Sequence, residues 1–539
     1  MGNSDRQTAL HFMQKTFDYS DNGFLAEIGE VEDTEAAPPR FKLYQQTSHY
    51  SLEQILPFAI GDARSSFLEF RHSQQQHSAN NQLNLQSLSA LLYYTYGFSR
   101  HDMGTKVYWP FHRFVPSARC LFPAELYLWL PQTAHIPAGI YHYDPLHHRL
   151  AQIRQGEYRS VLSQMVDAEL AESKAILLVS SLFWRNAFYY RNFSYRLCSQ
   201  EAGLLIGNAL LVAGALGLQG HVHYQFLDRP AHHLLGFDAN EESLMAVLPL
   251  YCWPKTGEQS IQPLTDEITE SDLLESMEPV TSVHQSMNSL DQRSCRALLE
   301  LERNSLLANT AEFARERTRE VFVCSQGEQR LMPPPISTTP LELTEALHRR
   351  NSGDVNFTPL ALPLSQSSFW EILRYALSPY SNDLKLPEPF LQLYIAVNNV
   401  DGLDKGIYRL CNHCHMLHVS KLEDVSLKLQ KAYTQIGVNC ASASLVCYIV
   451  VDYLTASEML GNRSYRIVHM ESGIIAQRLC VMSAAYNLAA RCSDGYHMPG
   501  CKALLGLTSP ATFPLFQVII GHEQAGTSGG ARYRMSTLL

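Results

Sequence analysis

The stretch SYRLCSQEAGLLIGNALLVAGALGL, residues 194–218, returns 270 positions later as SYRIVHMESGIIAQRLCVMSAAYNL, residues 464–488. Each copy is apolar on nearly every side when wound as an α-helix, which is typical of a helix buried on most of its surface. A repeat of about 270 residues is far longer than the unit of a solenoid. The pair therefore predicts two domains of one fold within a chain of 539 residues.

Shorter pieces repeat around the two long stretches, in the same order and at nearly the same offset. The matching pairs are ELYLWL at 125–130 with QLYIAV at 392–397, GIY at 139–141 with GIY at 406–408, and AILLVSSLFWR at 175–185 with SLVCYIVVDYL at 444–454. Their β-branched and aromatic residues favour strands, and the third pair is typical of a buried central strand. Each copy thus combines strands with helices, which predicts an α+β fold. Packing the two long helices against each other would give a pseudo-two-fold interface, an intramolecular pseudo-dimer.

Shifts in composition mark the boundaries between the repeated parts. An acidic, polar stretch and a proline-rich segment separate the copies, and residues 295–320 between them have a helical pattern. We expect an N-terminal extension that is loosely held. The predicted order is an extension at 1–45, a first domain at 46–252, a linker with a helical segment at 253–345, a second domain at 346–523 and a tail at 524–539.

The composition excludes several classes of protein. Hydrophobic residues make up 46% and charged residues 17%, which is typical of globular chains. The net charge of -10 gives no basic surface for nucleic acid or an anionic membrane. We find no apolar run of about 18 residues and no apolar signal core near the start, so we expect a cytoplasmic protein that does not cross a membrane.

One cysteine cluster departs from the scattered pattern of the twelve cysteines. Cys411, Cys414 and His415 lie in a short tract, and a CxxC with an adjacent histidine is a pattern that can bind zinc. The tract also has the pattern of a hairpin, and no second CxxC completes a set of four ligands. We therefore favour the hairpin and expect no metal site.

Several motifs together resemble a known family. In chain order they are R-x-S at 71–73, PSA followed by FP-x-ELY at 116–127, GIYHYDP at 139–145 and YR-x-x-x-x-EAG at 195–203, ahead of the long helix. Their order is similar to that of the SagB/McbC-type dehydrogenases of the nitroreductase superfamily. The resemblance covers roughly 40–250 well and 345–522 more weakly. It implies two fused nitroreductase-like domains, each with a central, mostly antiparallel sheet flanked by helices, and an FMN cofactor that accepts hydride when azoline rings of modified peptides are oxidised.

The resemblance places the phosphate of FMN on an arginine and a serine. A guanidinium can hold a phosphate with two parallel hydrogen bonds, and a serine hydroxyl near a helix start adds a short donor. In the first copy these residues are Arg71 and Ser73, with Gln75 where the family has a second basic residue. In the second copy they are Arg350 and Ser352. A surface arginine is the alternative for Arg71.

The resemblance places the isoalloxazine ring along the loop formed by Pro116, Ser117, Ala118 and Arg119. Small residues let backbone N–H groups reach the ring, although Arg119 replaces the usual glycine. An ordinary turn before a strand is the alternative. Gly217 and Leu218 end the long helix, where glycine serves as a helix cap, as a place for close approach to a ligand, or as both. His221 and His223 follow, and we favour structural roles for them over proton donation.

The second copy lacks the PSA loop, since SNDLKLPEP at 381–389 stands in its place. We therefore expect at most one flavin site. Its phosphate could lie on Arg71 and Ser73 or on Arg350 and Ser352. A hybrid site that combines Arg350 and Ser352 with Ser117 is one option.

The family has a Lys-Tyr pair just before the YR element, which takes a proton from the substrate. Here the aligned residues are Tyr189 and Tyr190, so the lysine is absent. We take Tyr190 as the first candidate for proton transfer and Tyr189 as the second. Simple aromatic packing beside the long helix is the alternative.

Three functions are compatible with these residues. The first is an FMN-dependent dehydrogenase or oxidase that acts on an azoline, or a similar C–N or C–C bond, in a peptide-derived natural product. The second is an FMN-dependent reductase of an activated double bond or nitro group. The third is a catalytically degenerate scaffold subunit. The expected partners are a peptide or peptide-like substrate and other enzymes of a biosynthetic complex, and further oligomerisation stays open.

Overall fold

The computed structural model describes most of the chain. The residues outside the description are 1, 29–36, 54–59, 65–66, 68–82, 105–106, 108, 253–263, 265–266, 281–282, 285–294, 315–329, 336–339, 354–355, 385–389, 412–413, 524–530 and 535–539. Arg71, Ser73 and Gln75 are among these residues, so their predicted roles stay outside the structure.

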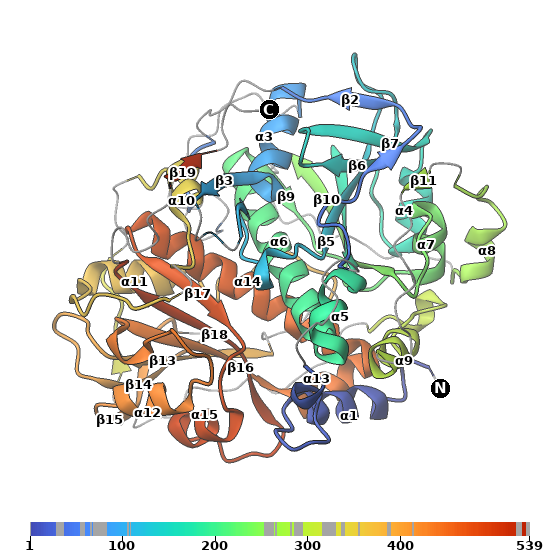
Figure 1. The fold of residues 1–539 in the computed structure, drawn as a ribbon. Helices are drawn as coiled ribbons and strands as arrows, with labels where there is room; N and C mark the ends of the chain where they lie inside the picture. Colours follow the sequence, from blue (N-terminus) through green and yellow to red (C-terminus); the bar gives the residue numbers. More distant parts are fainter. Residues whose placement is uncertain are drawn as a thin grey trace.

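The first half of the chain builds a seven-stranded antiparallel sheet (Figure 1). Its strands, in spatial order, are β2 (His49–Ser51), β7 (Arg149–Gln155), β6 (Gly139–Asp144), β5 (Ala124–Leu130), β8 (Ala175–Leu182), β10 (Glu242–Cys252) and β9 (Leu218–Gly220). β5 and β8 are buried along their whole length, and the apolar sequence of β8 predicts this.

The second half builds a sheet of the same order. Its strands are β12 (Arg330–Leu331), β15 (Leu417–Leu422), β14 (Gly406–Leu410), β13 (Leu391–Val397), β16 (Leu445–Asp452), β18 (Thr512–Gly521) and β17 (Ala489–Ser493). Each strand has a counterpart at the same place in the first sheet, and the repeated sequence pieces fall on equivalent strands. The predicted pair of α+β domains is therefore confirmed.

Helices and short strands surround the two sheets. The first half contributes α3 (Leu85–Tyr96), α4 (Arg159–Met165), α5 (Phe183–Tyr190), α6 (Ser194–Ala215) and α7 (Asp228–Leu235). The second contributes α10 (Leu343–Arg349), α11 (Gln366–Arg374), α12 (Ser426–Ala432), α13 (Tyr453–Leu460), α14 (Ser464–Ala485) and α15 (Met498–Leu505). The remaining elements are α1 (Gln7–Thr16), α8 (Glu270–Leu274), α9 (Arg296–Asn304), the pair β1 (Tyr44–Gln45) and β11 (Val283–His284), and the three-stranded sheet β19 (Ala531–Arg534), β3 (Phe98–Met103) and β4 (Phe111–Arg113).

The helices α6 and α14 lie side by side between the two sheets (Figure 1). Their N-terminal ends meet where the rings of Tyr195 and Tyr465 stack at 5.7 Å, and further along Gln477 donates to Asn208 at 3.1 Å. The two helices therefore run in the same direction, which places the pseudo-two-fold axis roughly along them. This contact confirms the interface that the repeated sequence predicts, and we call it the seam.

Glycine lets the helices approach this closely. A Cβ added to Gly203 would lie 1.9 Å from the carbonyl oxygen of Met470, and one added to Gly473 would lie 2.2 Å from that of Gln200. These two glycines hold equivalent positions in the repeat. Any side chain at either position would force the helices apart.

The N-terminal helix α1 packs against the seam instead of being loosely held. Phe12 is 2% exposed and its ring lies edge-on to Tyr465 at 4.9 Å. The hydroxyl groups of Thr16 and Tyr465 are 3.0 Å apart. The expectation of a loose extension is wrong for this helix, because its apolar face covers the N-terminal ends of α6 and α14.

Segments predicted as linker and tail also join the sheets. The short strand β12 lies at the edge of the second sheet, and β19 pairs with β3 of the first half. Glu302, on the linker helix α9, accepts from the hydroxyl of Tyr195 at 2.6 Å and forms an ion pair with Arg466 at 3.3 Å. The linker therefore ties the two halves together at the seam.

Among the described residues, one helical stretch, Phe183–Ala215, has the length and apolar composition to cross a membrane. Its most apolar window is 89% buried inside the protein. The packing of α6 against α14 accounts for that composition, because a helix covered on most sides needs apolar residues on most sides.

Candidate functional site

The loop between β4 and β5 has an unusual backbone. Arg119, Cys120 and Phe122 have φ values of 50°, 51° and 52°, in the left-handed region that non-glycine residues rarely adopt. The hydroxyl of Ser117 accepts a hydrogen bond from the N–H of Phe122 at 2.9 Å, which helps to close the loop. Strain of this kind persists only where surrounding contacts enforce it, and it gathers at functional sites. The left-handed backbone at Arg119 also explains why glycine is usual at this position in the family that the sequence resembles.

A buried arginine holds the far end of this loop. Arg185, on α5, is 1% exposed, donates to the carbonyl of Phe122 at 2.5 Å and pairs with Glu125 at 2.6 Å. The loop is thereby anchored to both a helix and a central strand. Backbone groups of Ser117 and Ala118 are held in place before any ligand arrives.

Glu201, on α6, lies against this loop. Burial raises the pKa of its carboxyl to about 7, while hydrogen bonds from Ser117 and Tyr96 oppose the rise. The Tyr96 hydroxyl donates to it at 2.8 Å. A carboxyl with this pKa exchanges a proton near neutral pH, so it is a functional candidate. In the sequence Glu201 stands out only as part of the EAG motif. The position of that motif in the core helix is the signal that could have identified Glu201 as a site residue.

Arg350 crosses the seam from the second half. It follows α10, is 4% exposed and donates from Nη2 to the backbone carbonyl of Arg113 at 3.2 Å. Its Nε and Nη1 have no hydrogen-bond partner among the described residues, and burial lowers the pKa of its guanidinium. A buried guanidinium is costly unless an anion neutralises it. The predicted phosphate ligand Arg350 is thus placed beside the first half's loop with donors to spare.

The surroundings of Arg350 favour negative charge. The thiols of Cys480 and Cys492 are 3.5 Å apart. The hydrogen bond from Cys492 lowers the pKa of the Cys480 thiol, and Arg350 lowers it further. Arg350 also acts on Cys120 in the strained loop, which places the guanidinium near that loop. This region offers the chemistry that a phosphate group requires.

Tyr189 and Tyr190 lie under the side chain of Arg119. The guanidinium of Arg119 is 5.3 Å from each ring centroid, close enough for a cation–π contact. Burial raises the pKa of Tyr190, and Arg119 only partly opposes the rise. Tyr190 is therefore protonated at neutral pH, which suits it to donate a proton and not to accept one.

The remaining predicted residues lie in different places. Pro116 and Ala118 are half-buried in the strained loop. The carbonyl of Ser352 accepts from Nε of Arg491 at 2.9 Å. Gly217, with φ of 77°, follows α6, and Leu218 begins β9. At 1.5 Å per residue Gly217 is roughly 24 Å along the helix axis from Glu201, so it does not touch the loop.

In the second half, hydrogen bonds close the place that corresponds to the Ser117 loop of the first half. The N–H of Val222 donates to the carbonyl of Ser381 at 2.9 Å, and the N–H of Asp383 donates back to Val222 at 3.0 Å. The carboxylate of Asp383 accepts from the N–H groups of Tyr224 and Gln225 at 3.0 and 2.9 Å. This segment stands where the first half has its PSA loop, so the seam is asymmetric.

His221 lies against this closed segment, and the His223 ring lies 4.6 Å from that of His221. His221 Nδ1 is 2.7 Å from the hydroxyl of Ser381, a structural contact. His223 is 2% exposed, and burial lowers its pKa well below the usual range, so it is neutral. The hydrogen bond of His221 supports the structural role that the sequence analysis favours for it.

Comparison with known proteins finds relatives that match part of the chain. No family model matches the chain. It is 31% identical over 156 residues to the microcin B17-processing protein McbC of Escherichia coli, covering 28% of this chain and 54% of that protein. It is 27% identical over 238 residues to the trifolitoxin-processing protein TfxB of Rhizobium leguminosarum bv. trifolii, covering 42% of this chain and 63% of that protein.

A solved structure matches both halves together. A candidate nitroreductase from Anabaena variabilis superposes with a TM-score of 0.69 and 20% identity, covering 96% of this chain and 99% of that one. The chain thus has a nitroreductase-like fold and is similar in sequence to the processing proteins McbC and TfxB. The superposition extends over both nitroreductase-like halves, and at this identity it shows the fold alone. The chain spans only about half to two-thirds of the length of McbC and TfxB.

Proposed function

We propose that the chain is an FMN-dependent oxidoreductase with one flavin site, in the seam beside the Ser117 loop. Arg350 carries the proposal, because its buried guanidinium has two unpartnered nitrogens and lies against the first half's loop. Arg350 would hold the phosphate, and Ser352 follows it closely in the chain. The backbone of Ser117, Ala118 and Arg119 would support the isoalloxazine ring. Bound FMN supplies hydride transfer at N5.

The preferred reaction is oxidation of an azoline or a similar C–N or C–C bond in a peptide-derived product. The similarity to McbC and TfxB, both named as processing proteins of peptide products, supports a peptide substrate and work beside other enzymes of a biosynthetic complex. In this reaction the chain must orient the substrate and accept a proton. Glu201, with a pKa of about 7, is the group near the loop that exchanges a proton in this range.

A second candidate function has an observation of its own. Tyr190 is protonated at neutral pH, and a protonated phenol beside the loop can donate to a substrate that gains electrons. Reduction of an activated double bond or a nitro group needs such a donor. Arg119 over the rings of Tyr189 and Tyr190 would also attract a polar, electron-poor substrate.

Two measurements test the proposal in order. Purified protein should be yellow and should release about one FMN per chain on denaturation. A colourless chain that takes up no added FMN would reject both enzymatic functions and would leave a scaffold subunit as the remaining function. Under anaerobic conditions a peptide azoline should then bleach the bound flavin. Rapid bleaching by NADPH, with none by the azoline, would instead establish the reductase.

A further inference from the structure

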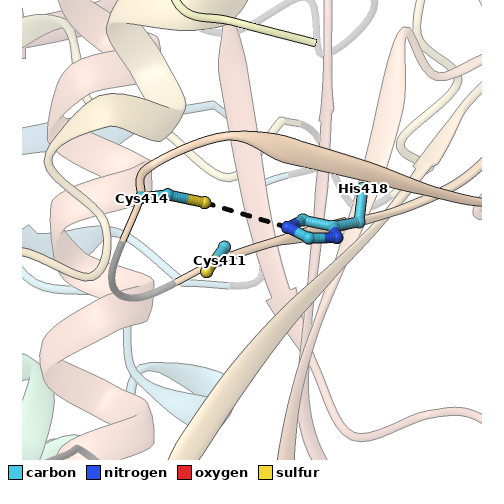
Figure 2. A group of neighbouring side chains, drawn as sticks. All are labelled: Cys411, Cys414 and His418. Atoms are coloured by element: carbon cyan, nitrogen blue, oxygen red, sulfur yellow. Dashed lines mark hydrogen bonds between the residues drawn. The ribbon is translucent and has the colours of Figure 1, made fainter. Parts of the chain in front are cut away.

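The outer hairpin of the second sheet gathers two thiols and an imidazole (Figure 2). Cys411 directly follows β14, Cys414 lies in the connection, and His418 is the second residue of β15. The ligand atoms of the three residues all lie within 4.8 Å of one another, and Cys414 Sγ is 3.8 Å from His418 Nε2. This cluster is separate from the Ser117 loop and from Arg350.

The register of the hairpin explains why these residues meet. His418 lies opposite Arg409, and Leu417 opposite Leu410. Side chains alternate along a strand, so His418 and Cys411 belong on the same face. The N–H of Cys411 donates to the carbonyl of Met416 at 3.0 Å, which extends the pairing to the cysteine.

The connection turns sharply enough to bring Cys414 back over this face. His415 has a φ of 51° and donates its N–H to the carbonyl of Cys411 at 3.1 Å. The turn therefore folds the second thiol toward the first. Cys411 is 9% exposed and His418 is 1% exposed, so both lie inside the protein.

We propose that Cys411, Cys414 and His418 bind a zinc ion. Two thiolates and an imidazole form a donor set that suits Zn²⁺ and does not suit Mg²⁺ or Ca²⁺. With Zn–S near 2.3 Å and Zn–N near 2.0 Å, ligand atoms in a tetrahedron lie roughly 3.5 Å apart. The observed spacing needs only small side-chain rotations to reach that geometry.

A cavity of about 250 Å³ beside Cys414 has room for a water molecule as a fourth ligand. Cys414 lines it together with Pro333, Trp370 and Arg374. These residues come from the end of β12 and from α11, so the ion would fasten the hairpin next to two other elements of the second half. A water molecule in the cavity completes a tetrahedron.

The hairpin that the sequence predicts is confirmed, and it does not exclude a metal. The hairpin pattern and the lack of a second CxxC are what disfavour zinc in the sequence, where His415 is the histidine next to the cysteines. Cross-strand pairing supplies a different third ligand, His418. The spacing C-x₂-C-x₃-H gives these three residues one short connection.

Metal content of the full-length protein tests the proposal. Protein purified with zinc and a phosphine reductant, then freed of loose metal by gel filtration, should retain about one zinc per chain by plasma mass spectrometry. Cys414→Ser and His418→Gln should each lose at least nine-tenths of it. Cys252→Ser, a half-buried cysteine on β10 of the first half, is the matched control and should keep the wild-type amount.

Two further readouts separate a metal site from other outcomes. Cobalt substitution should give thiolate-to-cobalt charge-transfer absorption that Cys414→Ser abolishes, with FMN content equal in both proteins. Wild-type protein without zinc after loading would overturn the proposal, as would a Cys411–Cys414 disulfide found by alkylation and mass spectrometry in freshly purified chain. Equal zinc in wild type and in His418→Gln would overturn the ligand set.

Discussion

Arg350→Met should abolish FMN binding while leaving the chain folded. The substitution keeps an unbranched side chain of similar length and removes the charge that the seam leaves unneutralised. Two charge-assisted hydrogen bonds to phosphate, from Nε and Nη1, would be lost at about 1.5 kcal/mol each, so Kd should rise at least 100-fold. The apoprotein loses one recorded bond, the 3.2 Å contact to the carbonyl of Arg113, worth about 1 kcal/mol. Relief from burying an unpaired charge offsets that loss.

Thermal unfolding with and without FMN measures both effects in one assay. At a hundredfold excess over Kd the ligand should stabilise the wild type by about 2.7 kcal/mol, and the variant by almost nothing. Arg349→Met is the control, because that side chain is 45% exposed and forms only a long ion pair with Glu345 at 3.6 Å. It should respond to FMN as the wild type does.

Two outcomes would refute the reasoning about Arg350. An Arg350→Met protein that binds FMN with wild-type affinity would move the phosphate elsewhere, to Arg71 and Ser73 in the first instance. A variant that unfolds several degrees earlier without ligand would show that Arg350 supports the fold and not an anion.

The other predictions concern proton transfer, pH and the seam. Tyr190→Phe should slow reduction of a double-bond or nitro substrate at least about tenfold with FMN still bound, because it removes the phenol proton donor while the ring contact with Arg119 survives; unchanged turnover would make Tyr190 a packing residue. Burial raises the pKa of Glu201 to about 7, so the folded state favours its protonated form, and stability is lost as pH rises from about 4.5 through 7. Glu201→Gln should therefore be more stable relative to wild type at pH 8 than at pH 5 in urea titrations, and an equal difference at both pH values would contradict the assignment. Gly203→Ala should destabilise the chain by about 2 kcal/mol or more, because its Cβ would meet the carbonyl of Met470 at 1.9 Å; a urea midpoint within error of wild type would show that the helices separate easily.

Local pattern was enough to predict the two halves and their interface. A helix that is apolar on every side must be covered, and a second copy of the same helix in the same chain offers the matching surface. The apolar runs at 175–185 and 444–454 also predicted one buried central strand in each half. The family resemblance named Pro116–Arg119 as the loop along the isoalloxazine ring.

The candidate site itself could be predicted only in part. The sequence offered Arg350 and Arg71 as alternative arginines for the phosphate. The contact of Arg350 with the carbonyl of Arg113, across the seam, joins residues 237 positions apart. No local pattern reports the pKa of Glu201, because burial by distant elements causes it. The packing of α1 was missed for the same reason, since its partners include Tyr465 at the far end of the chain.

The sequence alone determined that one fold occurs twice and that two long helices cover each other, because period and composition are carried by neighbouring residues. Tertiary structure alone decided that Arg350 lies beside the Ser117 loop and that Asp383 closes the opposite place across the seam. It also decided that His418 lies next to two cysteines within the outer hairpin of the second sheet. These arrangements depend on strand register and on contacts between distant parts of the chain, and a difference of one residue in register would turn His418 to the other face of its sheet.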